Sequence, residues 1–178
     1  MDSEPQIERI LFTEEQIDTR IREVAAEISA RYASVRLIAV LKGSVFFLTA
    51  LAREITIPVK IDFLSISSYS ERRGAQGMVR IEKDLDESIE GDDVLLIEDI
   101  VDTGFTTRYL LQNLAGRGPN SLAVCTLLDR SVRRIVNVPI AFRCFEIPDR
   151  FVVGFGLDHR QLCRNLRYIA VVDSDSAK

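Results

Sequence analysis

The stretch VLLIEDIVDTGFTT, from Val94 to Thr107, decides the fold that we predict for this chain. It opens with four successive apolar residues, Val94 to Ile97, which is typical of a strand buried on both faces of a parallel sheet. Two carboxylates, Glu98 and Asp99, follow directly, so we expect them at the carboxyl end of that strand. Ligands of open parallel sheets bind beyond this end of the strands. The stretch therefore predicts a central strand and the place of a binding site.

The second half of the stretch, Asp102 to Thr107, predicts a turn that opens a helix. A Thr-Gly-x-Thr-Thr turn offers backbone N–H groups, hydroxyls and the positive end of a helix dipole to a phosphate. Carboxylates beside such a turn suit a sugar phosphate, because they can hold its hydroxyls and a bound Mg²⁺. Taken singly, an acidic pair also fits a strand end that meets solvent, and Thr-Gly-x-Thr also fits a helix cap. Their combination in one short stretch favours a functional site.

The central stretch resembles the phosphoribosyl-pyrophosphate motif of the type I phosphoribosyltransferases. Further segments resemble the branch of that family that acts on 6-oxopurines. They are Leu41-Lys42-Gly43-Ser44, Ser68-Tyr69, Leu127-Leu128-Asp129-Arg130 and IPDRFVVGFGLDHRQLCRNL, from Ile147 to Leu166. The resemblance extends from about Ile10 to Val172. It implies purine salvage, in which a phosphoribosyl group moves from 5-phosphoribosyl 1-pyrophosphate to hypoxanthine or guanine, giving IMP or GMP and pyrophosphate.

The resemblance also implies roles for the residues around the sugar phosphate. Asp102 is implied to be the catalytic general base, near the imidazole side of the purine. Glu98 and Asp99 are implied to hold the ribose hydroxyls. The 5′-phosphate would bind Thr103, Gly104, Phe105, Thr106 and Thr107, and the pyrophosphate would bind Lys42, Gly43, Ser68, Tyr69 and Arg164. The family has a cis peptide bond before this lysine. The implied cofactor is magnesium, with Glu98, Asp99 and Asp158 as its ligands.

On the base side, Phe151 is implied to stack on the purine, while the Val152 backbone binds its edge and Asp158 its exocyclic side. Arg130 departs from the family, which usually has a lysine at this position against the purine 6-oxygen. Arginine keeps the positive charge and the N–H donors of the lysine, but its longer planar guanidinium does not fit against the 6-oxygen in the same way as an ammonium group. The preference among hypoxanthine, guanine and xanthine therefore stays open.

The rest of the chain predicts strands that alternate with helices. Thr13-Glu14-Glu15-Gln16 predicts a capping box, followed by an amphipathic helix to about Tyr32. Further expected elements are a helix at Val45–Ile55 and strands at Ile7–Phe12, Leu37–Leu41, Val59–Ile66, Val79–Lys83, Leu122–Leu128, Ile140–Ile147, Phe151–Phe155 and Tyr168–Val172. This order predicts an α/β fold with a doubly wound, mainly parallel sheet. We expect one domain over residues 1–178, with a small hood from about 1–12 and 130–178.

Two polar segments are expected to lie outside these elements. The segment from Ser67 to Met78 has no period and contains two glycines, so it predicts a mobile loop that closes over the site as a lid. Ser174 to Lys178 predicts a loose tail.

Composition narrows the classes of function. A net charge of −4 argues against a general nucleic-acid binder. It also counts against the alternative function, a regulator of this fold that binds RNA or DNA. The three cysteines are widely spaced, which predicts free thiols in a reducing cytoplasm. His159 and Cys163 are four residues apart and could share a helix face, but two ligands alone are weak evidence for a metal site. The polar start is no signal peptide, and no apolar run reaches about 18 residues, so we expect no membrane partner. The family's enzymes are dimers or tetramers, which implies a homodimer or homotetramer.

Overall fold

The computed structural model describes residues 5–69 and 78–173. Its helices are α1 (Glu14–Arg31), α2 (Ser44–Glu54) and α3 (Phe105–Ala115), with a short 3-10 helix η1 (Ser131–Arg133). Its strands are β1 (Ile7–Phe12), β2 (Val35–Leu41), β3 (Val59–Tyr69), β4 (Met78–Lys83), β5 (Asp93–Val101), β6 (Ser121–Asp129), β7 (Ile140–Glu146), β8 (Val152–Val153) and β9 (Ile169–Val172). No described helix is both long enough and apolar enough to cross a membrane.

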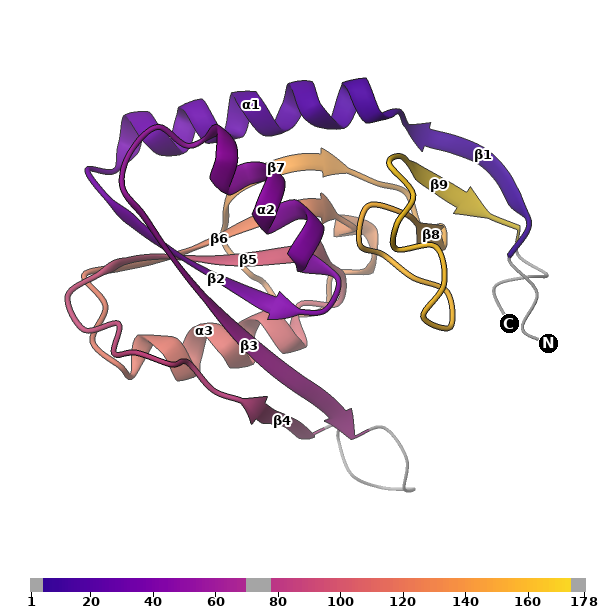
Figure 1. Cartoon of the computed structure of the whole chain (residues 1–178). Helices are drawn as coiled ribbons and strands as arrows, with labels where there is room; N and C mark the ends of the chain where they lie inside the picture. Colours follow the sequence, from indigo (N-terminus) through magenta and orange to yellow (C-terminus); the bar gives the residue numbers. More distant parts are fainter. Residues whose placement is uncertain (1–4, 70–77, 174–178) are drawn as a thin grey trace.

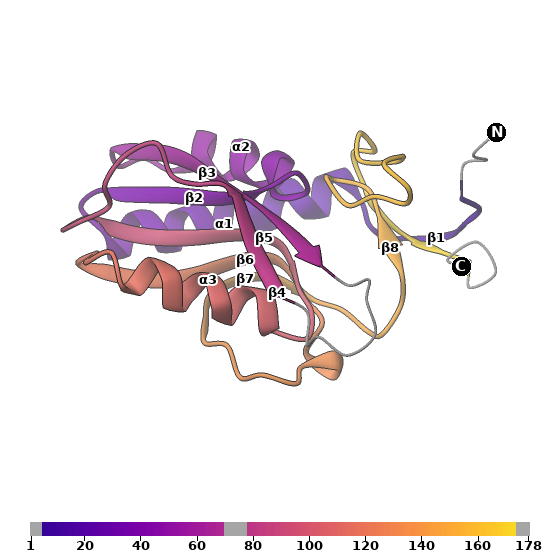
Figure 2. The same ribbon diagram turned by 90° about the horizontal axis from the view of Figure 1, so that it is seen from below.

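The strands form two sheets. A six-stranded sheet has the order β4-β3-β2-β5-β6-β7 and is parallel except for the β3–β4 pair. Helices α1 and α2 cover one face of it and α3 covers the other (Figures 1 and 2). A smaller antiparallel sheet, β1-β9-β8, lies at the end where the parallel strands finish. The predicted doubly wound, mainly parallel sheet is confirmed.

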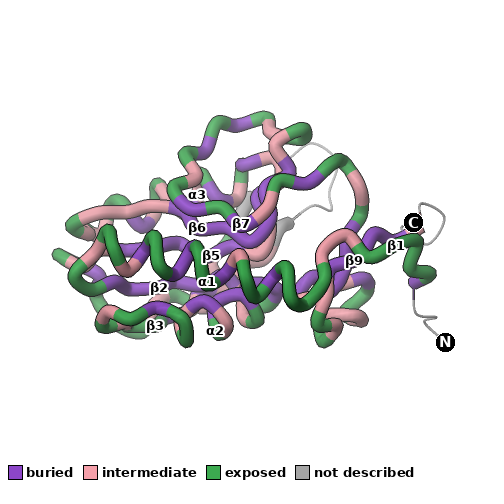
Figure 3. Tube along the Cα trace, turned by 90° about the horizontal axis from the view of Figure 1, so that it is seen from above, coloured by how far each residue is buried: buried purple, intermediate pink, exposed green. Residues whose placement is uncertain are grey.

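The two central strands are buried on both faces, as their apolar runs predict. Along β2, Leu37 and Ala39 belong to the apolar cluster that contains α1 and α2. The intervening Ile38 and Val40 belong to the cluster that contains Leu110 and Leu114 of α3. Figure 3 shows these strands mainly in the colour of buried residues, whereas the outer side of α1 is exposed. Alternation between two apolar clusters explains why the sequence shows a continuous apolar run.

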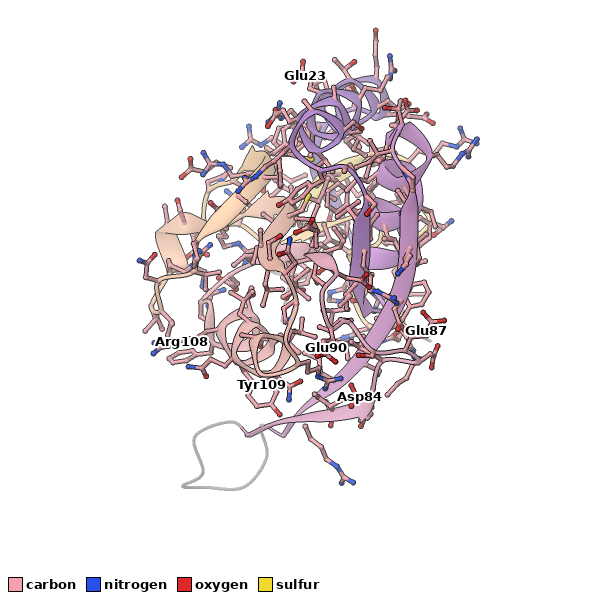
Figure 4. The ribbon with its side chains drawn as sticks, turned by 90° about the vertical axis from the view of Figure 1, so that its left-hand side faces the viewer. Glu23, Asp84, Glu87, Glu90, Arg108 and Tyr109 are labelled. Carbon is pink, nitrogen blue, oxygen red and sulfur yellow. The ribbon has the colours of Figure 1, made fainter. Side chains whose placement is uncertain are left out.

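Helix α1 begins with the predicted capping box. The Thr13 hydroxyl accepts a hydrogen bond from the Gln16 backbone N–H at 3.3 Å, and the Gln16 side chain accepts from the Thr13 N–H at 2.9 Å. Its buried positions, Ile17, Ile21, Val24, Ala25 and Ile28, face the sheet. Figure 4 places Glu23 of this helix and Arg108 of α3 on opposite sides of the molecule, which is the layering expected for helices on both faces.

The boundaries of the predicted loop between β3 and β4 were wrong at both ends. Ser67 to Tyr69 continue β3, and Met78 begins β4, in antiparallel pairing such as Ser68 with Val79. The paired ends of β3 and β4 extend beyond the rest of the sheet (Figure 2). Backbone pairing there does not require apolar side chains, so the polar composition of Ser67–Tyr69 wrongly indicated a loop. The remainder of the predicted lid, residues 70–77, and the predicted carboxyl-terminal tail, residues 174–178, lie outside the described residues.

The predicted hood also needs correction. Strand β7 pairs in parallel with β6, through partners such as Thr126 and Arg143, and belongs to the large sheet. In the small sheet, the strand predicted over Phe151–Phe155 is reduced to the two-residue β8, which pairs with β9. No helix forms in residues 154–168, so His159 and Cys163 do not share a helix face. Local turns with positive φ at Arg160, Gln161 and Cys163 replace a repeating pattern there.

Candidate active site

A pocket of about 340 Å³ opens at the carboxyl ends of β2 and β5, where the sequence predicts the site. Residues from five parts of the chain meet there: the end of β2 with the turn to α2, β3, β5 with the loop after it, the start of α3 and the turn after β8. Its lining consists of Val40, Leu41, Lys42, Gly43, Ile66, Glu98, Asp99, Ile100, Asp102, Thr103, Gly104, Thr106, Thr107, Asp158 and Arg164. The structure thus brings together most of the residues that the resemblance implies.

The acidic pair lies inside β5 rather than after it. The strand continues to Val101, so Asp102 is the first residue beyond it and not the fifth, as the apolar run alone suggested. Glu98 pairs with Thr126 of β6, and Val101 pairs with Asp129. Backbone pairing with β6 therefore extends β5 past Glu98 and Asp99, whereas the apolar pattern alone predicts that the strand ends before them.

Burial changes the electrostatics of this pair. Glu98 is buried, and its pKa is raised to about 8 because the carboxylate is desolvated and because Asp99 lies beside it. The Thr107 hydroxyl, 3.4 Å from a Glu98 oxygen, acts in the opposite direction. The pKa of Asp99 is also raised, mainly by desolvation, although the Ile100 N–H donates to it at 2.9 Å. Two desolvated carboxylates favour a positive partner or ligand hydroxyls.

Glu98 and Asp99 fit a magnesium ion that binds together with a phosphate-containing substrate. Their carboxylate oxygens are the hard ligands that Mg²⁺ prefers, and a cation would lower the raised pKa values. Among the described residues, no three acidic, histidine or cysteine side chains form a group that could hold a metal alone. Asp158 is instead paired with Arg164, at 2.8 Å. Mg²⁺ commonly binds through one or two carboxylates plus water and substrate phosphates, so such a cage is not required.

The turn before α3 has the geometry of an anion cradle. Gly104 has φ +90° and caps the helix, and Thr106 and Thr107 belong to its first turn. The first N–H groups of a helix have no partner within the helix, so they are free to meet a phosphate. A Cβ on Gly104 would lie 2.4 Å from the Val136 carbonyl oxygen. Both the backbone conformation and the packing therefore require glycine here.

The β2–α2 turn contains the expected cis bond, between Leu41 and Lys42. Lys42 is exposed and lines the pocket, whereas Gly43 is buried. A Cβ on Gly43 would lie 1.6 Å from an Asp99 oxygen, and one on Gly156 would lie 2.0 Å from the Gly43 carbonyl oxygen. Three chain segments therefore meet without room for side chains.

Of the residues implied on the base side, Asp158 lines the pocket, whereas Arg130, Phe151 and Val152 lie outside its lining. Arg130 is buried and pairs with Asp102 at 3.2 Å, and it donates to the Arg150 carbonyl at 2.8 Å. The ring of Phe151 is partly exposed and meets His159 edge to face, with centroids 5.8 Å apart. Phe105 also lies outside the lining, as do Ser68 and Tyr69, which the structure describes only as strand residues.

Sequence reasoning missed several residues that contact this site. Arg133 and Arg134 contact the loop at Asp102, the former through a 3.4 Å ion pair and the latter through the carbonyl. Gly156 accepts from Arg164 at 2.7 Å. The only available signal was the proximity of these arginines to Asp129-Arg130 and of this glycine to Asp158. Their side-chain directions depend on turns that no sequence period predicts.

The comparisons with known proteins agree with this geometry. A family model described as "Phosphoribosyl transferase domain" matches residues 11–160. The chain belongs to this phosphoribosyltransferase family. A relative from Mycobacterium avium named hypoxanthine-guanine phosphoribosyltransferase is 46% identical over 175 residues, covering 94% of this chain and 86% of the relative. A hypoxanthine phosphoribosyltransferase from Escherichia coli strain K12 is 44% identical over 167 residues, covering 92% and 94%.

A solved structure in the same family has nearly the same fold. The crystal structure of a hypoxanthine phosphoribosyltransferase from Staphylococcus aureus superposes with a TM-score of 0.92 at 39% identity. The superposition covers 97% of this chain and 95% of the other. The phosphoribosyltransferase fold predicted from the central motif is therefore confirmed.

Proposed function

We propose that this chain is a purine-salvage enzyme that transfers a phosphoribosyl group from 5-phosphoribosyl 1-pyrophosphate to hypoxanthine or guanine. The products are IMP or GMP and pyrophosphate. The names and identities of the relatives support this reaction. The observation that carries it is one pocket lined by the Glu98–Asp99 pair, the Thr103–Thr107 turn and two cationic side chains, Lys42 and Arg164.

The leaving group accounts for the cationic side chains. Bond formation at the anomeric carbon passes through an oxocarbenium-like state while pyrophosphate departs with its negative charge. Lys42 and Arg164 stabilise that charge, and Arg164 is held in place by Asp158 at 2.8 Å and by the Gly156 carbonyl at 2.7 Å. When bound, Mg²⁺ neutralises further charge on the pyrophosphate, with Glu98, Asp99 and Asp158 as the proposed ligands.

Asp102 is the proposed general base. One of its oxygens, Oδ2, faces Arg130 and Arg133, whereas Oδ1 is buried and has no hydrogen-bond partner within the protein. A buried acceptor without a partner is costly, so a bound ligand that donates an N–H to it is favoured. The imidazole ring of a 6-oxopurine carries such an N–H, and the carboxylate would accept its proton during transfer.

The base would bind between the loop and the small sheet. Arg130 supplies donors for the purine 6-oxygen, and its Nε is buried without a partner within the protein. Phe151, held edge-on by His159, provides a face for stacking, and the backbone of Val152 binds the purine edge. Ser68 and Tyr69, at the end of β3, are proposed to approach the pyrophosphate.

A pyrophosphate-release assay tests the function. Purified protein, Mg²⁺ and 5-phosphoribosyl 1-pyrophosphate are mixed with hypoxanthine, guanine, xanthine or adenine, and with no base. We expect release with hypoxanthine or guanine, no release with adenine or without a base, and loss of release when a chelator removes the metal. Failure to release pyrophosphate with any 6-oxopurine would overturn the proposal. No observation favours the alternative of a nucleic-acid-binding regulator.

Three further properties stay predictions. The chain length predicts one domain over residues 1–178, and the three cysteines predict a cytoplasmic location. The family resemblance implies a homodimer or homotetramer. Sedimentation of the purified protein checks the assembly. A monomer with full activity would contradict the predicted oligomer without affecting the reaction.

A further inference from the structure

The segment from Arg130 to Val136 lies against the loop that follows β5 and donates to three successive carbonyl groups. The Val101 carbonyl accepts from the Arg130 N–H at 3.0 Å and from Nη2 of Arg134 at 3.1 Å. The Asp102 carbonyl accepts from Nε of Arg134 at 2.8 Å. The Thr103 carbonyl accepts from the backbone N–H groups of Ile135 and Val136, both at 3.0 Å.

These bonds fix the direction of the neighbouring N–H groups. In a planar trans peptide, the N–H of one residue points opposite to the carbonyl of the residue before it. When the carbonyls of Asp102 and Thr103 face residues 134–136, the N–H groups of Thr103 and Gly104 face the other way. Both of these residues line the pocket, whereas residues 131–136, all of them described, do not. The N–H groups therefore point toward the side on which a phosphate would bind.

Arg134 is itself held firmly. Its side chain is mostly buried and pairs with Oδ1 of Asp129, a residue that is almost completely buried at the end of β6. The second oxygen of Asp129 accepts from Arg143 at 2.9 Å. A guanidinium can donate to two carbonyls and a carboxylate at once because its N–H groups form a rigid planar fork, which an ammonium group does not have.

We propose that Arg134 is a positioning residue for the phosphate-binding turn. It touches no substrate atom in this account. It holds the Val101 and Asp102 carbonyls away from the pocket, so that the turn presents its N–H groups to the 5′-phosphate before ligand binds. The ligand class, a sugar phosphate, rests on the proposed function, but the positioning itself rests on the hydrogen bonds alone.

The test measures phosphate binding without catalysis. Ribose 5-phosphate is titrated by calorimetry into the parent protein and into the Arg134→Met, Arg134→Lys and Arg143→Met variants. Arg143 is the matched control because it also pairs with Asp129 but donates to no carbonyl of the turn. We expect Arg134→Met to weaken binding by about tenfold or more, and Arg134→Lys to restore only part of this loss. Arg143→Met should remain within about twofold of the parent.

Kinetics separate positioning from a general loss of folding. In folded Arg134→Met protein, the KM for 5-phosphoribosyl 1-pyrophosphate should rise by a similar factor to the dissociation constant. If that variant does not fold, Arg134→Lys decides, with at least about threefold weaker binding than Arg143→Met. A folded Arg134 variant that binds ribose 5-phosphate within twofold of the parent would overturn the inference. A parent protein that binds this ligand but forms no nucleotide would instead overturn the proposed function.

Discussion

Arg130 and Asp102 form an ion pair, with Nη1 of the arginine 3.2 Å from Oδ2 of the aspartate. The same guanidinium donates to the Arg150 carbonyl, directly before Phe151. It therefore links the loop that carries the proposed base to the segment that carries the proposed stacking ring. A lysine, with a single nitrogen, would make these contacts with a different geometry.

This arrangement predicts selectivity for 6-oxopurines. A guanidinium has only donors, so it satisfies the 6-oxygen of hypoxanthine or guanine but meets the amino group of adenine donor to donor. A site built around such a hydrogen bond discriminates by roughly 10⁴-fold. Arg130→Lys should retain 6-oxopurine activity, and Arg130→Ala should lose most of it. The measurement is kcat/KM for hypoxanthine, guanine, xanthine and adenine on all three proteins.

Adenine used by the parent within about tenfold of hypoxanthine would show that the role given to Arg130 is wrong. The control is Arg150→Ala, because Arg130 donates to the backbone carbonyl of Arg150, which alanine retains. That variant should keep the preference of the parent among the four bases.

Asp102→Asn should keep the fold and the binding of 5-phosphoribosyl 1-pyrophosphate but lower kcat by roughly 10²-fold or more. An amide fits the same space and still meets Arg130, but it cannot accept a proton from the purine. Thermal unfolding and substrate titration of the variant verify that only turnover changes. A kcat within about twofold of the parent would exclude Asp102 as the base.

Gly43→Ala should reduce activity strongly, because the added Cβ would lie 1.6 Å from an Asp99 oxygen and displace that side chain. Gly91→Ala is the matched control. Gly91 has a positive φ of 76°, so alanine is strained there as well, but no atom lies within 4 Å of the new Cβ. We expect the control to lose some stability and no activity when both variants are assayed under conditions in which they are folded. Equal activity of the two would contradict the packing account.

The raised pKa of Glu98 predicts a pH dependence of stability. Its pKa is about 8 in the folded state, against 4.5 for the unperturbed group, so between these values the folded state binds more protons than the unfolded state. The free energy of unfolding then falls as pH rises through this range. Without divalent metal, the melting temperature of the parent should therefore fall relative to that of Glu98→Gln between pH 5 and pH 8. A difference that is constant or rises with pH would refute the assigned cause.

The sequence predicts the large sheet and the pocket because both depend on local patterns. Apolar runs mark β2 and β5, and the turn chemistry at Gly104 marks the start of α3. The end of β5 was misjudged because pairing with β6 extends the strand through Glu98 and Asp99. The predicted hood included β7 because no local pattern shows that this strand pairs with β6.

The contacts of Arg134 could not be predicted for a related reason. They depend on how the segment after β6 folds back on the loop after β5, with Asp129 as the anchor. No period or motif in the sequence records a contact between a side chain and a backbone carbonyl 32 residues away. The family resemblance implied roles for single residues, whereas the hydrogen bonds that hold the loop after β5 in place are seen only in the structure.

The most direct test of the central claim is identification of the nucleotide formed by the parent enzyme. Protein, Mg²⁺ and 5-phosphoribosyl 1-pyrophosphate are incubated with hypoxanthine, and the product is identified by mass and chromatography beside a reaction with the Asp102→Asn variant. We expect IMP and pyrophosphate in equal amounts from the parent and roughly 10²-fold slower formation by the variant. Pyrophosphate without IMP, or no product from hypoxanthine or guanine by a folded protein, would contradict the central claim.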